Sequence, residues 1–141
     1  MASKTQFTEA EWQTLQWAVA DTMAYLSMAD PGLWDTFKEA KGAAKYIVGV
    51  KTAGDDVLVR QLADDIHAKR DKALSGNPTN VADEVIARVR EALDIVSAKA
   101  PEDVAAFKTF ILGVAKATAE AAKGIGPNEA AAIGKLEATL G

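Results

Sequence analysis

The chain has 141 residues, the usual length of a single domain, and 49% of them are hydrophobic, which is enough for one folded core. Its net charge of −4 repels nucleic acid and anionic membrane surfaces, so we expect neither as a partner. The absence of cysteine excludes disulfides, thiolate zinc sites and cysteine nucleophiles. The sequence shows no signal peptide and no run of ~20 apolar residues, so we expect a cytoplasmic protein.

The first predicted helix spans residues 8–28 and begins with a complete start signal. Thr8 is placed to cap the helix, and Glu11, three residues later, completes a capping box. Phe7, just before the cap, is placed to pack against Trp12. These side chains mark the helix start at three independent points.

Two further helices are predicted before the middle of the chain. One runs from Asp30 to Gly54, and the next from Asp55 or Asp56 to a breaker over residues 75–78. Apolar residues recur in both at three- or four-residue spacing, which indicates one buried face. These stripes are Leu33, Phe37, Ala40, Ala44 and Ile47 in the second helix, and Leu58, Leu62 and Ile66 in the third.

Three more helices follow the breaker. The fourth ends at Ala100, the fifth begins at Pro101, and the sixth follows a glycine-containing turn over residues 123–127. Their apolar stripes are Val81, Val85, Val89, Ala92 and Val96 in the fourth, Val104, Phe107, Ile111, Val114 and Thr118 in the fifth, and Ala130, Ile133, Leu136 and Leu140 in the sixth.

No segment of the sequence alternates with period two, so no sheet is predicted. The connections are short, which favours neighbouring helices packed antiparallel. The sequence therefore predicts an all-α fold, a single-domain bundle of about six helices over residues 1–141. We expect the polar residues 1–6 to be disordered.

The first helix is unusual because it is apolar on two faces. Its core face carries Trp12, Leu15, Val19, Met23 and Leu26. The opposite face clusters Trp17, Ala24 and Met28, with Asp21 beside them. Such a helix is central to the bundle and covered by the fifth and sixth helices, presents its second face to a partner or a second copy, or lines a ligand pocket.

One group of metal-capable side chains stands out. Asp64, His67 and Asp71 occupy positions i, i+3 and i+7 of the third helix and therefore share a face. That face lies opposite the apolar stripe and includes Arg60, so a solvated surface explains the group as well as a metal site does. We keep both interpretations.

His67 is the only histidine, which limits the chemistry available. A di-iron bundle needs two Glu-x-x-His motifs, and a haem needs a histidine that is not on a polar face. A Ser-His-Asp hydrolase needs a nucleophile elbow, which the sequence lacks. We therefore expect no enzymatic activity and no cofactor.

Four pairs of adjacent acidic residues are spread along the predicted helices. Two of the pairs lie at predicted helix starts, where negative charge is favourable. We interpret all four as helix caps and solubilising charge. They are Asp55-Asp56, Asp64-Asp65, Asp83-Glu84 and Glu102-Asp103.

The last quarter of the chain carries a resemblance to a known family. Residues 121–129, followed by the stripe from Ala132 to Leu140, resemble the helix-turn-helix of tellurite-resistance TerB-like proteins. Lys123 stands where that family has an aspartate, and the turn is shorter by about one residue. The resemblance implies a small all-helical protein linked to metal or stress responses through acidic residues.

Three functional hypotheses follow. The leading one is a non-enzymatic bundle that acts through protein contacts, by self-association along the first helix around Trp17 and Met28. The alternative is a TerB-like protein that binds a divalent metal through Asp30, or through Asp64, His67 and Asp71. A bundle that binds a small apolar ligand between the first and fifth helices is the third.

Overall fold

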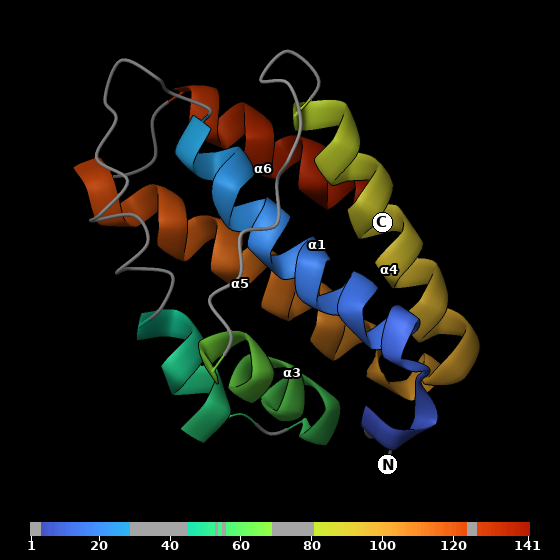
Figure 1. Cartoon of the computed structure of the whole chain (residues 1–141). Helices are drawn as coiled ribbons and strands as arrows, with labels where there is room; N and C mark the ends of the chain where they lie inside the picture. The colour runs from blue at the N-terminus through green and yellow to red at the C-terminus, as the bar shows by residue number, and fades with distance from the viewer. Residues whose placement is uncertain (1–3, 29–44, 53, 55, 69–80, 124–126) are drawn as a thin grey trace.

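The computed structural model describes residues 4–28, 45–52, 54, 56–68, 81–123 and 127–141 (Figure 1). All regular structure in these ranges is helical, which confirms the predicted all-α fold. Residues 45–52 form the end of the predicted second helix, whose earlier residues lie outside the described ranges. The other elements are η1 (Lys4–Gln6), α1 (Glu9–Met28), α3 (Val57–Ala68), α4 (Val81–Lys99), η4 (Pro101–Asp103), α5 (Val104–Lys123) and α6 (Pro127–Leu140).

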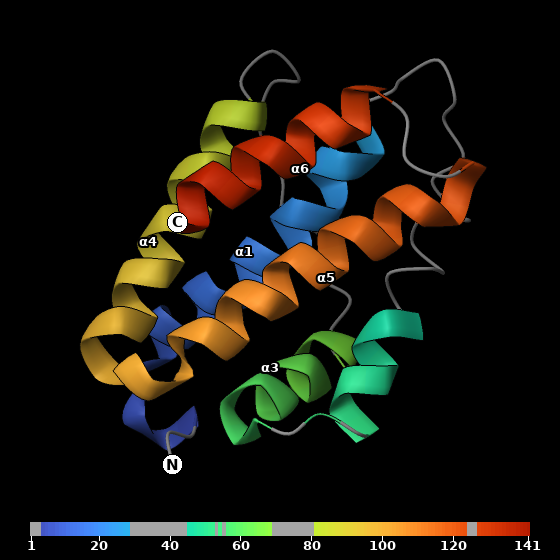
Figure 2. The same ribbon diagram turned by 180° about the vertical axis from the view of Figure 1, so that it is seen from behind.

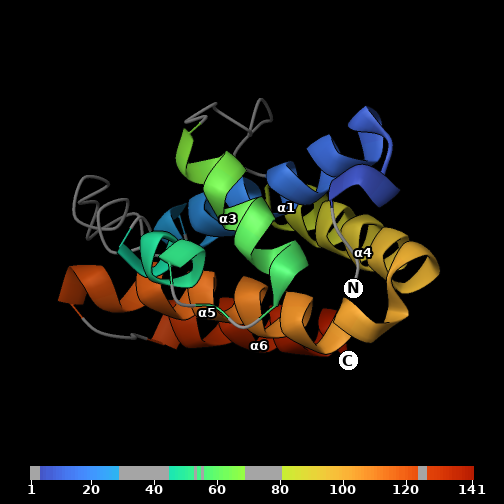
Figure 3. The same ribbon diagram turned by 90° about the horizontal axis from the view of Figure 1, so that it is seen from below.

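Helix α1 lies at the centre of the bundle. It contacts α3, α4, α5 and α6, and its most extensive contacts are with α4 and α5. Helices α5 and α6 run side by side (Figure 2), and α1 and α4 lie over them (Figure 3). The sequence predicted cover from the fifth and sixth helices, and α3 and α4 are the neighbours that this prediction missed. Among the described residues, no helix combines the length and apolar content needed to cross a membrane.

Where the structure describes them, the predicted apolar stripes contribute most of the core. Leu33, Phe37, Ala40 and Ala44, and the side chains of Ile66 and Val81, lie outside the described residues. In α6 the stripe is rotated from its predicted position, because Ala130 is exposed and Ala132 is buried. At 100° per residue, Ala132 lies closer than Ala130 to the direction of Leu136. The largest side chains buried throughout are Phe107, Phe110, Leu15, Leu26, Leu58, Leu62, Ile111 and Leu136.

The start of α1 has the predicted capping geometry. The Glu11 backbone N–H donates to Thr8 Oγ1 at 3.1 Å, and the Thr8 N–H donates to Glu11 Oε1 at 2.8 Å. The rings of Phe7 and Trp12 pack with their centroids 5.8 Å apart. Disorder was predicted for the residues before the cap, but Lys4–Gln6 form a 3₁₀ turn.

Polar contacts fasten this end of α1 to its neighbours. Glu11 pairs with Lys99 at the end of α4, with 2.9 Å between Oε1 and Nζ. The Gln6 amide donates to the carbonyl oxygen of Lys99 at 3.4 Å. From the core side of α1, the Trp12 indole N–H donates to Asp65 Oδ2 of α3 at 2.7 Å. One end of the central helix is therefore held by both α3 and α4.

The helical segment 45–52 packs closely against α5 at Gly113, which has no side chain to obstruct Tyr46. Tyr46 stacks on Phe110 with ring centroids 6.1 Å apart. A Cβ atom built on Gly113, one turn along α5, would overlap the hydroxyl and ring of Tyr46. Gly113 is therefore needed for close approach.

This packing predicts opposite effects for two glycine-to-alanine substitutions. Gly134→Ala should raise the free energy of unfolding by roughly 0.5–1 kcal/mol, because alanine is the better helix former and a Cβ at Gly134 meets no atom within 4 Å. Gly113→Ala should lower it by about 1 kcal/mol, because displacing Tyr46 outweighs the helix-propensity gain. Urea denaturation of both variants measures this, and equal stabilisation would contradict the Tyr46 contact.

Candidate functional site

A buried ion pair joins the middle of α1 to α4. Asp21 is fully buried, at 0% exposure, and Arg88 Nη1 donates to its Oδ2 at 2.5 Å. The other carboxylate oxygen, Oδ1, is also buried and has no hydrogen-bond partner. Because an unpaired buried charge is costly, Arg88 is the group that makes an aspartate tolerable at this position.

The same arginine covers an exposed tryptophan. The Arg88 guanidinium carbon lies 5.0 Å from the centre of the Trp17 ring, in cation–π geometry. Trp17 is 37% exposed, and Val48 is the other large apolar side chain exposed in the described part of the chain. Trp17, Asp21 and Arg88 are hereafter called the seam cluster. Asp21 is buried, Arg88 is partly exposed and Trp17 is exposed, so the three side chains extend from the interior to the surface.

The two contacts of Arg88 differ in strength. A hydrogen bond between charged groups contributes about 1.5–3 kcal/mol, whereas a cation–π contact at an exposed site contributes about 0.5–1 kcal/mol. The Asp21 contact is also the buried one, and the Arg88 side chain retains 28% exposure. Asp21 therefore determines where the Arg88 guanidinium lies.

The pKa of Asp21 is raised from its usual 3.8 to about 6, and burial is the largest cause. The charge and hydrogen bond of Arg88 act against this rise, and the negative charge of Glu84, on α4, adds to it. The loss of hydration thus outweighs the cation. The seam cluster consequently contains a carboxyl group that titrates in mildly acidic solution.

The predicted interface residues lie in different environments in the structure. Trp17 is on the surface, whereas Asp21, predicted beside it, is inside and occupied by Arg88. The side chains of Ala24 and Met28 lie outside the described residues. Sequence reasoning missed Arg88, although an arginine directly before Val89 of the α4 stripe was a signal that a cation borders the core.

The predicted metal group is not assembled within the described residues. Asp64 is exposed and pairs with Lys51, with 3.1 Å between Oδ1 and Nζ. The His67 side chain, Asp71 and Asp30 lie outside the described part. Within that part, no group of three acidic, histidine or cysteine side chains is placed to hold a metal. The metal site stays a prediction.

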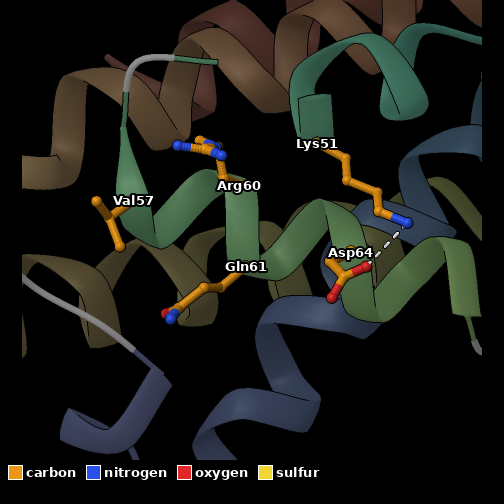
Figure 4. A pocket seen from close by; sticks show the side chains of 5 residues that line it. All are labelled: Lys51, Val57, Arg60, Gln61 and Asp64. Carbon is orange, nitrogen blue, oxygen red and sulfur yellow. Dashed lines mark ion pairs between the residues drawn. The ribbon is translucent and has the colours of Figure 1, made fainter. Parts of the chain in front are cut away.

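A shallow hollow of about 390 Å³ lies between the segment 45–52 and α3. Figure 4 shows the Lys51–Asp64 pair on one side, whereas the side chains of Arg60 and Gln61 point in different directions. Among the described residues that line it, Val57 is the apolar one. Ligand pockets are mostly apolar with converging polar groups, so this hollow does not favour the small-ligand hypothesis.

A second buried carboxyl lies between α3 and the start of α5. Asp56 caps α3 by accepting the Val59 N–H at 2.9 Å. Asp103 is 6% exposed, and burial, followed by a hydrogen bond with Asp56 and the charge of Glu102, raises its pKa to about 6. From the sequence, Asp55-Asp56 and Glu102-Asp103 were interpreted as separate acidic pairs. In the structure the two pairs are in contact, because Asp56 and Asp103 share a hydrogen bond.

Comparison with known proteins adds no relative. No protein-family model matches the chain, and no curated protein or solved structure is significantly similar to it. The TerB-like resemblance of the C-terminal quarter stays a prediction, and the site is interpreted from its own geometry.

The metal hypothesis predicts heat on calorimetric titration with calcium, zinc or manganese. Asp64→Asn should weaken any such binding, because it removes one carboxylate of the predicted group. Asp94→Asn, at an exposed position of α4, is the matched control with the same change of charge. The absence of binding tighter than millimolar for all three ions would end the hypothesis.

The raised pKa of Asp21 predicts that this residue makes the protein less stable as the pH rises, the opposite of the effect of an aspartate whose pKa is lowered by folding. Below about pH 4 the carboxyl is protonated in both states. From there to about pH 6 the unfolded chain has released the proton and the folded chain keeps it, so the free energy of unfolding falls as the pH rises. The contribution of Asp21 should fall by on the order of 1–3 kcal/mol.

Chemical denaturation of the wild type and of Asp21→Asn at four pH values between about 4.5 and 7 measures this contribution as a difference. The wild type should lose stability relative to the variant as the pH rises. The same comparison with Asp103→Asn measures the pH-dependent contribution of Asp103 to the free energy of unfolding. A difference between wild type and Asp21→Asn that is constant with pH would contradict the buried titration.

Proposed function

We propose that this protein is a non-enzymatic helical bundle that acts through protein contacts, by self-association through the seam cluster. The observation that carries the proposal is Trp17, an exposed tryptophan held beneath an arginine that is itself fixed by a buried carboxylate. Tryptophan and arginine are enriched among the residues that dominate binding energy at protein interfaces.

The arrangement is pre-organised for contact. Ordering a long side chain on binding costs about 0.5–1.5 kcal/mol, and the Asp21 contact has already restricted Arg88 in the folded monomer. The Trp17 ring lies on the central helix, whose packing on four neighbours restricts its movement. A partner therefore meets a side-chain pair that needs little further ordering.

A second copy of the chain is the partner that this chemistry favours. In a two-fold symmetric interface, the same patch lies on both sides, so it must be complementary to itself. An aromatic ring beside a guanidinium meets that requirement, because Arg88 of one copy can stack on Trp17 of the other. A single copy supplies both halves of the contact.

Sedimentation velocity at micromolar to millimolar concentrations tests the proposal. The wild type should form a dimer, and Trp17→Ala should weaken dimerisation at least 30-fold, the effect of an interface side chain worth about 2 kcal/mol. Val48→Ala, which truncates the other large apolar side chain that is exposed among the described residues, should leave dimerisation unchanged. A wild type that is monomeric throughout, or equal effects of both substitutions, would refute the proposal.

A further inference from the structure

The Arg88 side chain has a second carboxylate within reach. Glu84 precedes it by four residues on α4, a spacing that places the two on the same face of the helix. Glu84 is also close enough to Asp21 for its charge to raise the pKa of the buried carboxyl. Arg88 thus stands between one acid on its own helix and one on α1.

The two acids differ in what they do to Trp17. The contact to Asp21 holds the guanidinium over the ring, as observed. A contact to Glu84 is made within α4 and does not require Arg88 to reach across to α1. The Arg88 side chain is partly exposed, so the protein does not enclose it completely, and its contact with the charged Asp21 is what holds it across the seam.

One carboxylate oxygen of Asp21, Oδ1, is available to bind a proton. The other, Oδ2, faces Arg88, whereas Oδ1 is buried without a partner. The described charged groups that act on Asp21 are Arg88 and Glu84, both on α4. Helices α3, α5 and α6 also pack on α1 but add no charge at Asp21 in the part that the structure describes.

We propose that Asp21 is a proton-operated latch: its carboxylate holds Arg88 over Trp17, and protonation at Oδ1 releases Arg88 toward Glu84 and uncovers the ring. The neutral carboxyl still accepts a hydrogen bond, but it loses the charge that makes this bond strong. The raised pKa of the group, about 6, supports release in mildly acidic solution.

Uncovering the ring has a consequence for association, and this step alone rests on the proposed function. The proposed interface uses Arg88 where the Asp21 carboxylate has already placed it, beside Trp17, and release of Arg88 removes this pre-organisation. Self-association should therefore be weaker at pH 5 than at pH 7.5. The latch itself is a property of one chain and can be measured on the monomer.

Nuclear magnetic resonance at low protein concentration tests the latch. The indole N–H signal of Trp17, assigned by its loss in Trp17→Phe, and the Nε–H signal of Arg88 should move together with a midpoint near pH 6. In Asp21→Asn, whose amide imitates the neutral carboxyl, both signals should remain at their low-pH positions. Circular dichroism verifies that this variant is folded.

Glu84→Gln is the second variant. It removes a negative charge that raises the pKa of Asp21, so the midpoint should move to lower pH. A Trp17 signal that stays fixed from pH 7.5 to 5, or that still titrates in Asp21→Asn, would overturn the latch.

Sedimentation at the two pH values separates the latch from the proposed function. Titrating signals in a chain that is monomeric at both pH values would leave the latch standing and refute self-association. A dimer of equal stability at both pH values, with Trp17 and Arg88 signals that do not change with pH, would support self-association and refute the latch.

Discussion

The constraint on which the structure depends is that α1 must be buried along most of its length by four other helices. A helix in this position can carry polar side chains only where a neighbour supplies a partner or where the surface is reached. Trp12, Thr22 and Asp21 satisfy this rule in different ways. The Trp12 indole donates to Asp65, the Thr22 hydroxyl donates to the carbonyl of Ala18 at 2.8 Å, and Asp21 needs a cation.

The Asp21–Arg88 pair is an expensive way to join two helices. Replacing such a pair by apolar residues is often neutral or stabilising, whereas removing one partner leaves a buried charge. Its physical effect is positional, because the contact forms at one register of α1 against α4.

The sequence predicted the features that depend on neighbouring residues. The capping box of Thr8 and Glu11 and the stripes of α4 and α5 follow from spacing along one helix, and the structure has them. The contacts Asp21–Arg88, Asp56–Asp103 and Tyr46–Gly113 each join residues that are 47 or more positions apart. Composition and periodicity contain no information about which helices become neighbours, so Asp21 was predicted beside Trp17 on the face opposite the core, and both its burial and its partner Arg88 were missed. The same reason explains why α4 was missed as the main cover of α1.

The two carboxyls with pKa values raised to about 6 show why perturbed titration alone does not identify a site. Burial is the largest cause for both, but their partners act in opposite directions. Asp103 lies against another carboxyl, which favours its protonated form and is explained by the packing of the α3 cap on η4. Asp21 lies against a cation that opposes protonation, and that cation extends to an exposed aromatic ring. A change of charge at Asp103 is confined to a structural junction, whereas a change at Asp21 has a direct physical route to the molecular surface.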